Sequence, residues 1–368
     1  RGAIRITDKT FTRKNGEIVK IRGIADSGSS SMMIPRPGSG GHIDMGKAMD
    51  ANHGWVYAAV KAIADEMANT EFKVYKIKKN GDHEEVPEHP LLDFLDAVND
   101  FQTGPEFKYI IASHLELTGN AFIYLMDVKT FESQPKSMHI LNPAKVKVML
   151  DRTTYPYKIA GYEFQIDQRT FRFHPYEIVH LKYPDPSNPY MGMGTVQGIA
   201  EWIDNDNNST EFLRQFFRNG AQIGNIFETD MSGEDQLMEL RDSFNEQHSG
   251  VENAYKGMFL PKGVKKPTTD AKFSEIGYTD ISNTSRDRIL AGFRVSKTIL
   301  GAAESETNRA TAETADYVFA KRTIKPKMTL ICSYLNEFLV PRFGKDIYLT
   351  FVDPVPQDKA VLSTEMRN

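Results

Sequence analysis

One segment, residues 194–220, restricts the folds open to this chain more than any other part of the sequence. Thr195 can cap its start and Gly220 can end it, so the segment predicts one long helix. Two aspartates, three asparagines, a serine and a threonine fill its middle, from Asp204 to Thr210. Because such residues are poor helix formers in isolation, neighbours must hold the helix, at a subunit interface or in a water-filled channel. The apolar positions that can share a face are Val196, Ile199, Ile203, Phe212, Phe216 and Phe217.

The residues before this helix predict a mixed domain. Helical and strand patterns alternate over 54–190, which is typical of an α+β fold. Helices are expected from Gly54, after Pro90 and from Pro105, and strands near Phe72, after Asn120 and over 138–150, 156–166 and 170–182. Residues 1–50 are rich in glycine, serine and charge and predict a flexible extension with one small hairpin around Asn15-Gly16. Order is therefore expected from about Gly54.

The residues after the long helix predict a small insert and then a return to helix. The insert covers 222–275, with a helix from Ser232 to His248 and short strands near 222–228, 254–261 and 270–275. A helix is expected over 279–300, a helical region over 310–339 interrupted at Pro326, a strand over 347–352 and a new helix from Asp358.

Charge and cysteine content exclude several classes of protein. The net charge is −4 with mixed signs along the chain, which disfavours a tight grip on nucleic acid but allows a polyanion to slide past. Cys332 is the only cysteine, so no intrachain disulfide or multi-cysteine zinc site is expected. The sequence contains no run of 18 apolar residues, so no membrane helix is predicted, and no signal peptide is recognised. The chain begins at Arg1 rather than at a methionine, and we expect residues to be missing at both ends.

A search for chemistry yields no catalytic, cofactor or metal motif. His174, Glu177 and His180 cannot converge on a metal if they lie in a strand, because Glu177 then points to the opposite face. The acidic and amide clusters at 185–189 and 204–208 hold too few carboxylates for a cation site. The basic run 321–327 is best interpreted as a solvated helix face, with phosphate contact in a channel as the alternative.

The segment 300–314 (LGAAESETNRATAET) is small, polar and free of proline, between an apolar run and a long helical pattern. It could be a catalytic lid, a linker, or a surface that touches a partner without gripping it. Ser305 and Thr307 have no histidine or lysine beside them in sequence, so an enzyme interpretation has little support.

Seven pieces of sequence occur in an order and spacing that resemble the portal proteins of tailed double-stranded DNA bacteriophages. The resemblance covers roughly 54–368, with Ser296 at a position where the family often has proline. The pieces are LTGNAFIYL, LNPAKVKV, FHPYEIVHLKYPDPSNPYMGMGTV, FFRNGAQIGNIFETD, VENAYKGMFLPKG, RILAGFRVSKTILG and NRATAETADYVFAKRTIKPKMTLICSYLNEFLV.

The resemblance implies a ring, usually of twelve subunits, through which DNA enters and leaves the capsid. Residues 1–50, the flexible extension, have no counterpart in the family. For the rest of the chain the resemblance implies these parts: a wing at 51–193 and 310–357, stem helices at 194–221 and 278–300, a clip at 222–277, a tunnel loop at 301–309 and the start of a mostly absent crown at 358–368. Its implied partners are neighbouring copies, double-stranded DNA, terminase, the head–tail adaptor and the major capsid or scaffold protein. Neither membrane nor cofactor is implied.

Candidate site residues follow from those implied parts. The tunnel loop would present Ala302, Ala303, Glu304, Ser305, Glu306, Thr307, Asn308 and Arg309 to DNA. The polar face of the stem would contain Asp204, Asp206 and Asn207. The clip would dock its partners through Glu234, Asp235, Glu239, Lys262, Lys265 and Lys266.

The composition of the loop suits a channel, because each phosphate that a loop grips adds friction to moving DNA. Glu304 and Glu306 would repel and centre the duplex. Arg309 lies at a helix start, where the macrodipole disfavours a cation, so we expect it to have a partner, either an acid of the adjacent subunit or a DNA phosphate. Two alternatives remain: a nucleic-acid-processing enzyme with its active site at 301–309, and a structural adaptor that never meets DNA.

Overall fold

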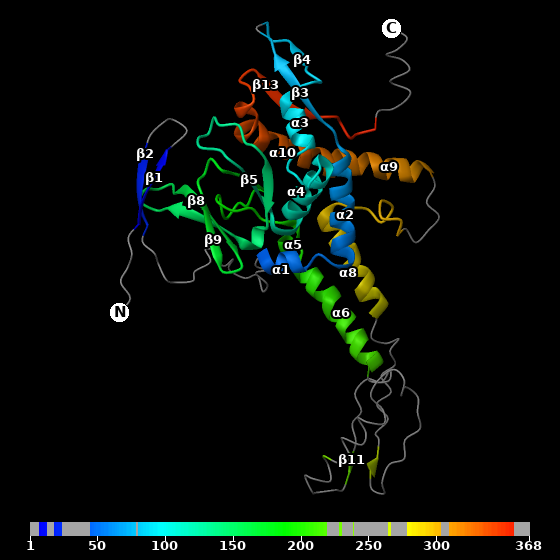
Figure 1. Ribbon diagram of the computed structural model, residues 1–368. Coiled ribbons are helices and arrows are strands. Elements are labelled where there is room, and N and C mark those ends of the chain that lie inside the picture. The colour runs from blue at the N-terminus through cyan, green and yellow to red at the C-terminus, as the bar shows by residue number, and fades with distance from the viewer. Residues whose placement is uncertain are drawn as a thin grey trace, which may run out of the picture. The chain divides into compact units, whose positions relative to one another are not determined.

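The computed structural model describes residues 7–12, 18–23, 45–78, 80–218, 228–229, 238, 264–265, 278–302 and 309–356. The chain divides into two compact units (Figure 1). Unit 1 comprises residues 1–200 and 290–368, and unit 2 comprises the inserted residues 201–289. Helices and small antiparallel sheets alternate, as the predicted α+β fold requires.

Three helices form the centre of unit 1: α2 (Gly54–Asn69), α4 (Gly104–Thr118) and α10 (Lys325–Phe338). α2 packs along α4, and its buried positions include Val56, Val60, Ile63 and Met67, the face that the sequence predicted. Capping explains the bounds of α4: the Thr103 hydroxyl accepts the amide hydrogen of Glu106, and Gly119 ends the helix with a φ of 73°. The short helix α3 (Pro90–Asp96) begins where Pro90 was expected to start it.

Three three-stranded sheets surround these helices. Their orders are β10-β5-β6, β7-β8-β9 and β13-β3-β4. The strands are β3 (Phe72–Ile77), β4 (His83–Glu85), β5 (Asn120–Leu125), β6 (Met138–Leu141), β7 (Val146–Asp151), β8 (Lys158–Ile166), β9 (Arg169–Phe173), β10 (Ile178–Lys182) and β13 (Ile347–Phe351). The first two sheets share a buried cluster of Phe122, Leu141, Val146, Tyr162 and Ile178. Because β13 pairs with β3, the two sequence segments of unit 1 contribute strands to one sheet.

Three glycines bring two distant turns into backbone contact. A Cβ on Gly192 would lie 2.0 Å from the carbonyl oxygen of Gly119, and one on Gly119 would lie 2.2 Å from the carbonyl carbon of Met193. A Cβ on Gly194 would likewise lie 2.6 Å from the carbonyl oxygen of Leu117. This junction joins the end of α4 to the start of α5 (Thr195–Gly198), and no side chain can enter it.

Unit 2 contains most of α6 (Ala200–Arg218) and of α8 (Tyr278–Phe293). The Arg288 guanidinium lies over the Trp202 ring, 5.5 Å from its centroid, while Ile203, Ser285 and Ile289 are buried. The strands β11 (Glu228–Thr229) and β12 (Val264–Lys265) pair with each other. The helix expected over 232–248 falls outside the described residues except at Met238, and the strands expected near 254–261 and 270–275 fall outside them altogether.

Both connections between the units leave unit 1 at one place. Ile199 and Gly292 are neighbours there, because a Cβ on Gly292 would lie 2.5 Å from Cγ2 of Ile199.

Several predicted bounds were wrong. The helix expected over 194–220 is divided at Ile199, which has φ −119° and ψ 16°, into α5 and α6. Each of the strands expected over 138–150 and 170–182 is two strands, because Pro143 and Pro175 cannot donate to a ladder. Gly54 is not the start of regular structure, because α1 (Met45–Asp50), with its buried Ala48, precedes it.

The expected N-terminal hairpin is confirmed as β1 (Thr7–Thr12) paired with β2 (Ile18–Gly23). The Asn15-Gly16 turn itself lies outside the described residues, as does the helix expected from Asp358.

Candidate channel segment and its buried anchor

The chain approaches the segment predicted to be a tunnel loop through two closed turns. α8 ends at Phe293 rather than at the predicted residue 300. The amide of Arg294 donates to the carbonyl of Ala291, and that of Val295 donates to the carbonyl of Leu290. This pair of bonds is a Schellman motif, in which a left-handed residue ends the helix. Arg294 has a φ of 59°, an uncommon conformation for a residue other than glycine.

A second turn of the same kind ends at Gly301, which has a φ of 67°. The amide of Ala302 donates to the carbonyl of Lys297 over 2.9 Å. Residues 303–308, and with them Ala303, Glu304, Ser305, Glu306, Thr307 and Asn308, lie outside the described residues. Of the loop predicted at 301–309, the structure therefore describes only the two edges, Gly301 with Ala302 and then Arg309.

The chain resumes at Arg309 as α9 (Arg309–Phe319). The Arg309 guanidinium pairs with the Glu313 carboxylate one turn along the same helix, at 2.7 Å. Its partner in the described chain is thus intrahelical, neither of the two that the sequence suggested. This bond raises the pKa of the Arg309 guanidinium, and since both side chains are exposed, it contributes little to stability.

α9 joins α10 through a π-helical turn, Ala320–Ile324, in which the amide of Lys325 donates to the carbonyl of Ala320. The sequence predicted an interruption at Pro326, but the helix bulges one turn earlier and continues through that residue. An α-helix would require a Pro326 amide hydrogen for the carbonyl of Arg322 and would press the ring against that oxygen. The wider turn removes this conflict.

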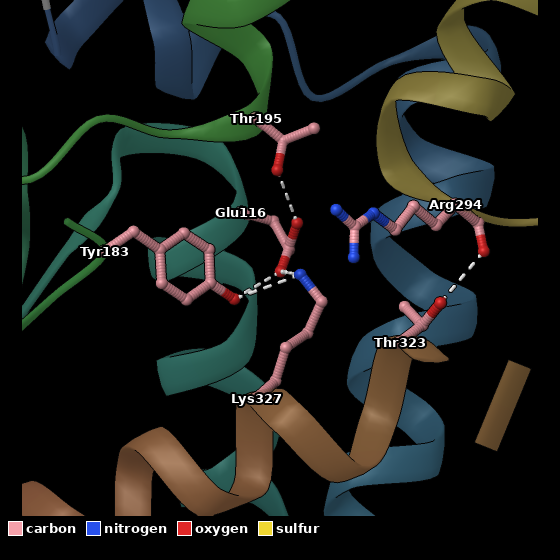
Figure 2. Close-up of polar contacts among 6 residues, drawn as sticks. All are labelled: Glu116, Tyr183, Thr195, Arg294, Thr323 and Lys327. Atoms are coloured by element: carbon pink, nitrogen blue, oxygen red, sulfur yellow. Dashed lines mark hydrogen bonds and ion pairs between the residues drawn. The ribbon is translucent and has the colours of Figure 1, made fainter. Parts of the chain in front are cut away.

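A buried carboxylate fixes the start of α10. Glu116, in the last turn of α4, has no exposed side-chain surface and forms an ion pair with Lys327. The Tyr183 hydroxyl donates to the same carboxylate oxygen, and the Thr195 hydroxyl donates to the other at 2.8 Å (Figure 2). These four residues, the Glu116 cluster, join α4, the end of β10, α5 and α10.

The electrostatics of the cluster are those of a closed structural joint. Burial, followed by the negative charge of Glu116 and the bond to it, raises the pKa of the Tyr183 phenol well above its ordinary value, so the phenol stays protonated and donates. The Lys327 ammonium also lies 4.9 Å from the centroid of the Tyr183 ring, a cation–π contact. Lys327, Tyr183 and Thr195 all donate to a carboxylate that solvent does not reach, and Lys327 also donates to the Tyr183 hydroxyl at 3.2 Å, so the cluster links the elements that carry these four residues.

Arg294 reaches the same place from the turn before the loop. Figure 2 shows its guanidinium pointing toward the Glu116 carboxylate, while its carbonyl oxygen accepts the Thr323 hydroxyl at 3.0 Å. Thr323 belongs to the π-helical turn. The turn before the loop and the π-helical turn beyond α9 are therefore tied to one region of unit 1.

Sequence reasoning missed Glu116, Tyr183 and Thr195 and interpreted Lys327 as part of a solvated face. Lys321 and Lys325 of that basic run are exposed, as expected; Lys321 contacts Tyr317, and Lys325 pairs with Asp353. One available signal was Glu116 itself, an acid in the last turn of a helix, where the macrodipole disfavours a negative charge. The same reasoning had singled out Arg309, a cation at the start of a helix, where the macrodipole disfavours a positive charge.

A second buried polar network lies at the glycine junction. The Asn120 amide nitrogen donates to the carbonyls of Thr118 and Gly192, so its oxygen is the acceptor for the Gly192 amide and for His180 Nε2. His180 therefore carries its proton on Nε2, and its ring stacks on Phe122. Burial, with a smaller contribution from the Lys182 charge, lowers the pKa of His180 to about 3.

The other predicted site residues are not gathered into one place. His180 is buried in β10, whereas His174 precedes Pro175 and its amide donates to the Glu177 carboxylate. Across the described ranges, no three histidine, cysteine or acidic residues come together as metal ligands, and no helix is both long and apolar enough to cross a membrane. On α6, Asp204 is exposed and Asp206 and Asn207 are half-buried. Lys265 lies in β12, while Glu234, Asp235, Glu239, Lys262 and Lys266 lie outside the described residues.

Comparison with known proteins places this arrangement in a family. Residues 55–354 match the family model described as "Phage portal protein". A relative, the probable portal protein of Streptomyces phage phiC31, is 24% identical over 221 residues; the match covers 57% of this chain and 46% of the relative, so this chain spans less than half the length of that relative.

Two solved structures share the fold. A chain in the neck of an empty gene transfer agent (GTA) particle matches with a TM-score of 0.64 and 20% identity, over 89% of this chain and 88% of the other. An HK97-family phage portal protein from Corynebacterium diphtheriae matches with a TM-score of 0.57 and 14% identity, over 88% of this chain and 99% of the other. Since the family model covers most of the sequence and the folds agree along almost the full length, this chain belongs to the phage portal protein family.

Proposed function

We propose that the chain is the subunit of a portal ring in a phage-like particle, and that DNA passes through the ring into and out of the capsid. The match to the portal family over residues 55–354 carries this proposal. The shared fold with chains of a particle neck and of a phage portal supports it. Portal proteins are structural rather than enzymatic, and the closed Glu116 cluster agrees with a supporting role for the residues behind the loop.

Within that ring, residues 302–309 would face the channel and α6 and α8 would form the stem. The observation that favours this assignment is the anchoring of the chain around the loop: the Arg294–Thr323 bond ties the turn before the loop to the π-helical turn beyond α9, and the Lys327–Glu116 pair fixes the start of α10. A loop that flanks moving DNA needs fixed ends, because any slack in its supports would change the width of the channel. The polar side chains Asp204, Asp206 and Asn207 would then line the stem or its subunit interface.

Partners follow from the same assignment. Unit 2, an insert with its own paired strands, would dock terminase during packaging and a head–tail adaptor afterwards. The wing in unit 1 would contact the major capsid or scaffold protein. The complex would occupy one vertex of the virion and assemble in the host cytoplasm.

The first test is the mass of the purified chain by native mass spectrometry or light scattering. Twelve copies of 41.6 kDa give 12 × 41.6, about 499 kDa. A closed ring near that mass with a central hole of at least about 20 Å, enough for a duplex, would support the proposal (compare the groove dimensions in). A monomer or dimer at every concentration and salt tested would contradict it, and nuclease or ATPase activity of the pure chain would favour the enzyme alternative. A ring with a hole too narrow for a duplex would favour the adaptor.

A further inference from the structure

α9 has little tertiary packing against the other described elements of unit 1. Within the described part of the chain it packs substantially only on the π-helical turn that continues it, and in Figure 1 it extends past α2. Exposure confirms this: Val318 is 49% exposed and Tyr317 is 40% exposed, although both lie within one turn of the buried Phe319. The helix is therefore held at its C-terminal end and has little to hold it elsewhere.

The side chains of α9 nevertheless divide into two faces. At 100° per residue, Ala312, Ala315 and Val318 lie within about 120° of arc, which also contains buried Phe319 and one polar residue, the exposed Thr311. These three exposed or half-buried residues are the apolar face of α9. The opposite side contains the Arg309–Glu313 ion pair and Tyr317, whose hydroxyl accepts from Lys321 at 2.9 Å.

Helix physics requires something to cover that face. α9 continues through the π-helical turn into the packed α10, so its helical conformation is nucleated there, but its own 11 residues lack the tertiary packing that supplies most of a helix's stability in proteins. Two alanines and a valine facing water add no stability, whereas alanines in contact with a partner permit close helix approach. The polar side is already satisfied within the helix, so the missing contacts belong to the apolar face.

Charge argues against DNA as the covering partner. α9 contains Arg309 (+1), Glu313 (−1) and Asp316 (−1), a net charge of −1, and its only cation is paired with Glu313. A phosphate backbone would be repelled by this helix. A closed ring supplies a different occupant, because its head-to-tail interfaces join unlike patches, so that each subunit offers one patch and covers another.

We propose that the apolar face of α9 is covered by a neighbouring copy of this chain, so that α9 is held along its length only after the ring has closed. This inference rests on the proposed ring. Its consequence is that the C-terminal edge of the loop at 303–308 is positioned by the next subunit, whereas the N-terminal edge is positioned by the subunit's own Arg294–Thr323 bond. The channel segment is then complete only in the assembly.

The test compares amide hydrogen exchange over residues 309–319 in rings and in monomers separated by size from one preparation of the full chain. We expect exchange to be at least ten-fold slower in the ring, while α4 is protected equally in both. Val318→Asp should shift the population from ring to monomer or abolish the added protection. Tyr317→Asp is the matched control, since it places the same charge on the adjacent residue but on the polar side, and it should leave both unchanged.

A cross-linking measurement covers the case in which no monomer is recovered. Cys332 is the only cysteine and is 5% exposed, and burial raises the pKa of its thiol to about 12, so it should stay unlabelled. Val318→Cys, labelled with a maleimide that carries a photoactivatable group, should give a ladder of cross-linked subunits after illumination. Tyr317→Cys, labelled in the same way, should give far fewer cross-linked subunits. Rings in which α9 exchanges as fast as in the monomer, or in which both cysteines cross-link equally, overturn this inference alone. A chain that never forms a ring overturns it together with the proposed function.

Discussion

Lys327 compensates a carboxylate that water cannot reach. A buried ion pair is costly to assemble, and its importance to stability appears when one member is removed, because the other charge is then left without compensation. Lys327→Met leaves Glu116 with two neutral hydroxyl donors, and we expect it to lower the free energy of unfolding by about 3–5 kcal/mol. Thermal or urea unfolding at fixed protein concentration measures this loss.

The neighbouring Lys325 provides a matched control. It pairs with Asp353, and both side chains are nearly half exposed, so Lys325→Met should cost less than about 1 kcal/mol. Adding Glu116→Gln to Lys327→Met should recover part of the loss, because the stranded charge disappears. Equal losses from the two lysine variants would show that the Glu116 cluster is not a stabilising joint.

Two buried histidines predict acid sensitivity. Burial lowers the pKa of His114 to about 4 and that of His180 to about 3, from 6.5 in the unfolded chain. Between those values and 6.5 the unfolded chain binds protons that the folded chain rejects. Stability is therefore complete above pH 6.5 and falls as the pH drops, by roughly 1.4 kcal/mol per pH unit for each histidine, until the folded pKa is reached. Denaturant unfolding between pH 7 and pH 5 measures the slope.

The same two histidines should respond in opposite ways to substitution at pH 7. Among the described residues, His114 Nδ1 has no hydrogen-bond partner, so His114→Leu should be neutral or stabilising by up to about 1 kcal/mol. His180→Leu removes a donor from the buried Asn120 oxygen and should cost about 1–3 kcal/mol. Each variant should also reduce the pH slope, and an unchanged slope in both would contradict the assignment.

At the scale of elements, the glycine junction should tolerate almost no change. Gly192→Ala places a Cβ 2.0 Å from the Gly119 carbonyl oxygen, a backbone atom that cannot move without shifting α4. We expect a loss of about 3 kcal/mol or more in stability, or failure to fold. Gly198→Ala is the control: its nearest neighbour is the flexible tip of Met193 at 3.6 Å, so it should be neutral or stabilising by up to about 1 kcal/mol. Similar losses in both variants would mean that the junction is not specially tight.

Elements were predictable wherever one residue decides them. Pro90 and Pro105 mark helix starts in sequence and in structure, and α2 buries the face that its spacing predicted. The failures arise where distant contacts decide. The break at Ile199 lies where that side chain meets Gly292, and the π-helical turn before Pro326 is tied to Arg294, both far away in sequence. The Glu116 cluster joins residues from 116 to 327, and no local pattern could reveal its four members together.

At the scale of the whole molecule, the channel proposal makes a prediction about salt. Glu304→Lys with Glu306→Lys would replace two negative charges by two positive ones on each subunit at the loop. Since each ion pair formed with phosphate releases counterions, the variant ring should retain duplex DNA at low salt, with affinity falling steeply as salt rises. The unaltered ring should retain it weakly. Fluorescence anisotropy of labelled duplex across a salt series measures the difference.

The control for that experiment reverses a charge elsewhere in unit 1. Glu84 is exposed in β4 and pairs with Lys78, so Glu84→Lys should leave DNA retention unchanged. If the loop variant and the control behave alike, residues 304 and 306 do not face the DNA.

The contact between Ile199 and Gly292 has a consequence for how the protein evolves. Since the chain leaves unit 1 and re-enters it at one point, residues 201–289 form an inserted unit, and the core of unit 1 is complete without them. Such an insert can lengthen, shorten or be exchanged between lineages while the fold of unit 1 is conserved by selection. Relatives should therefore diverge fastest between these two residues.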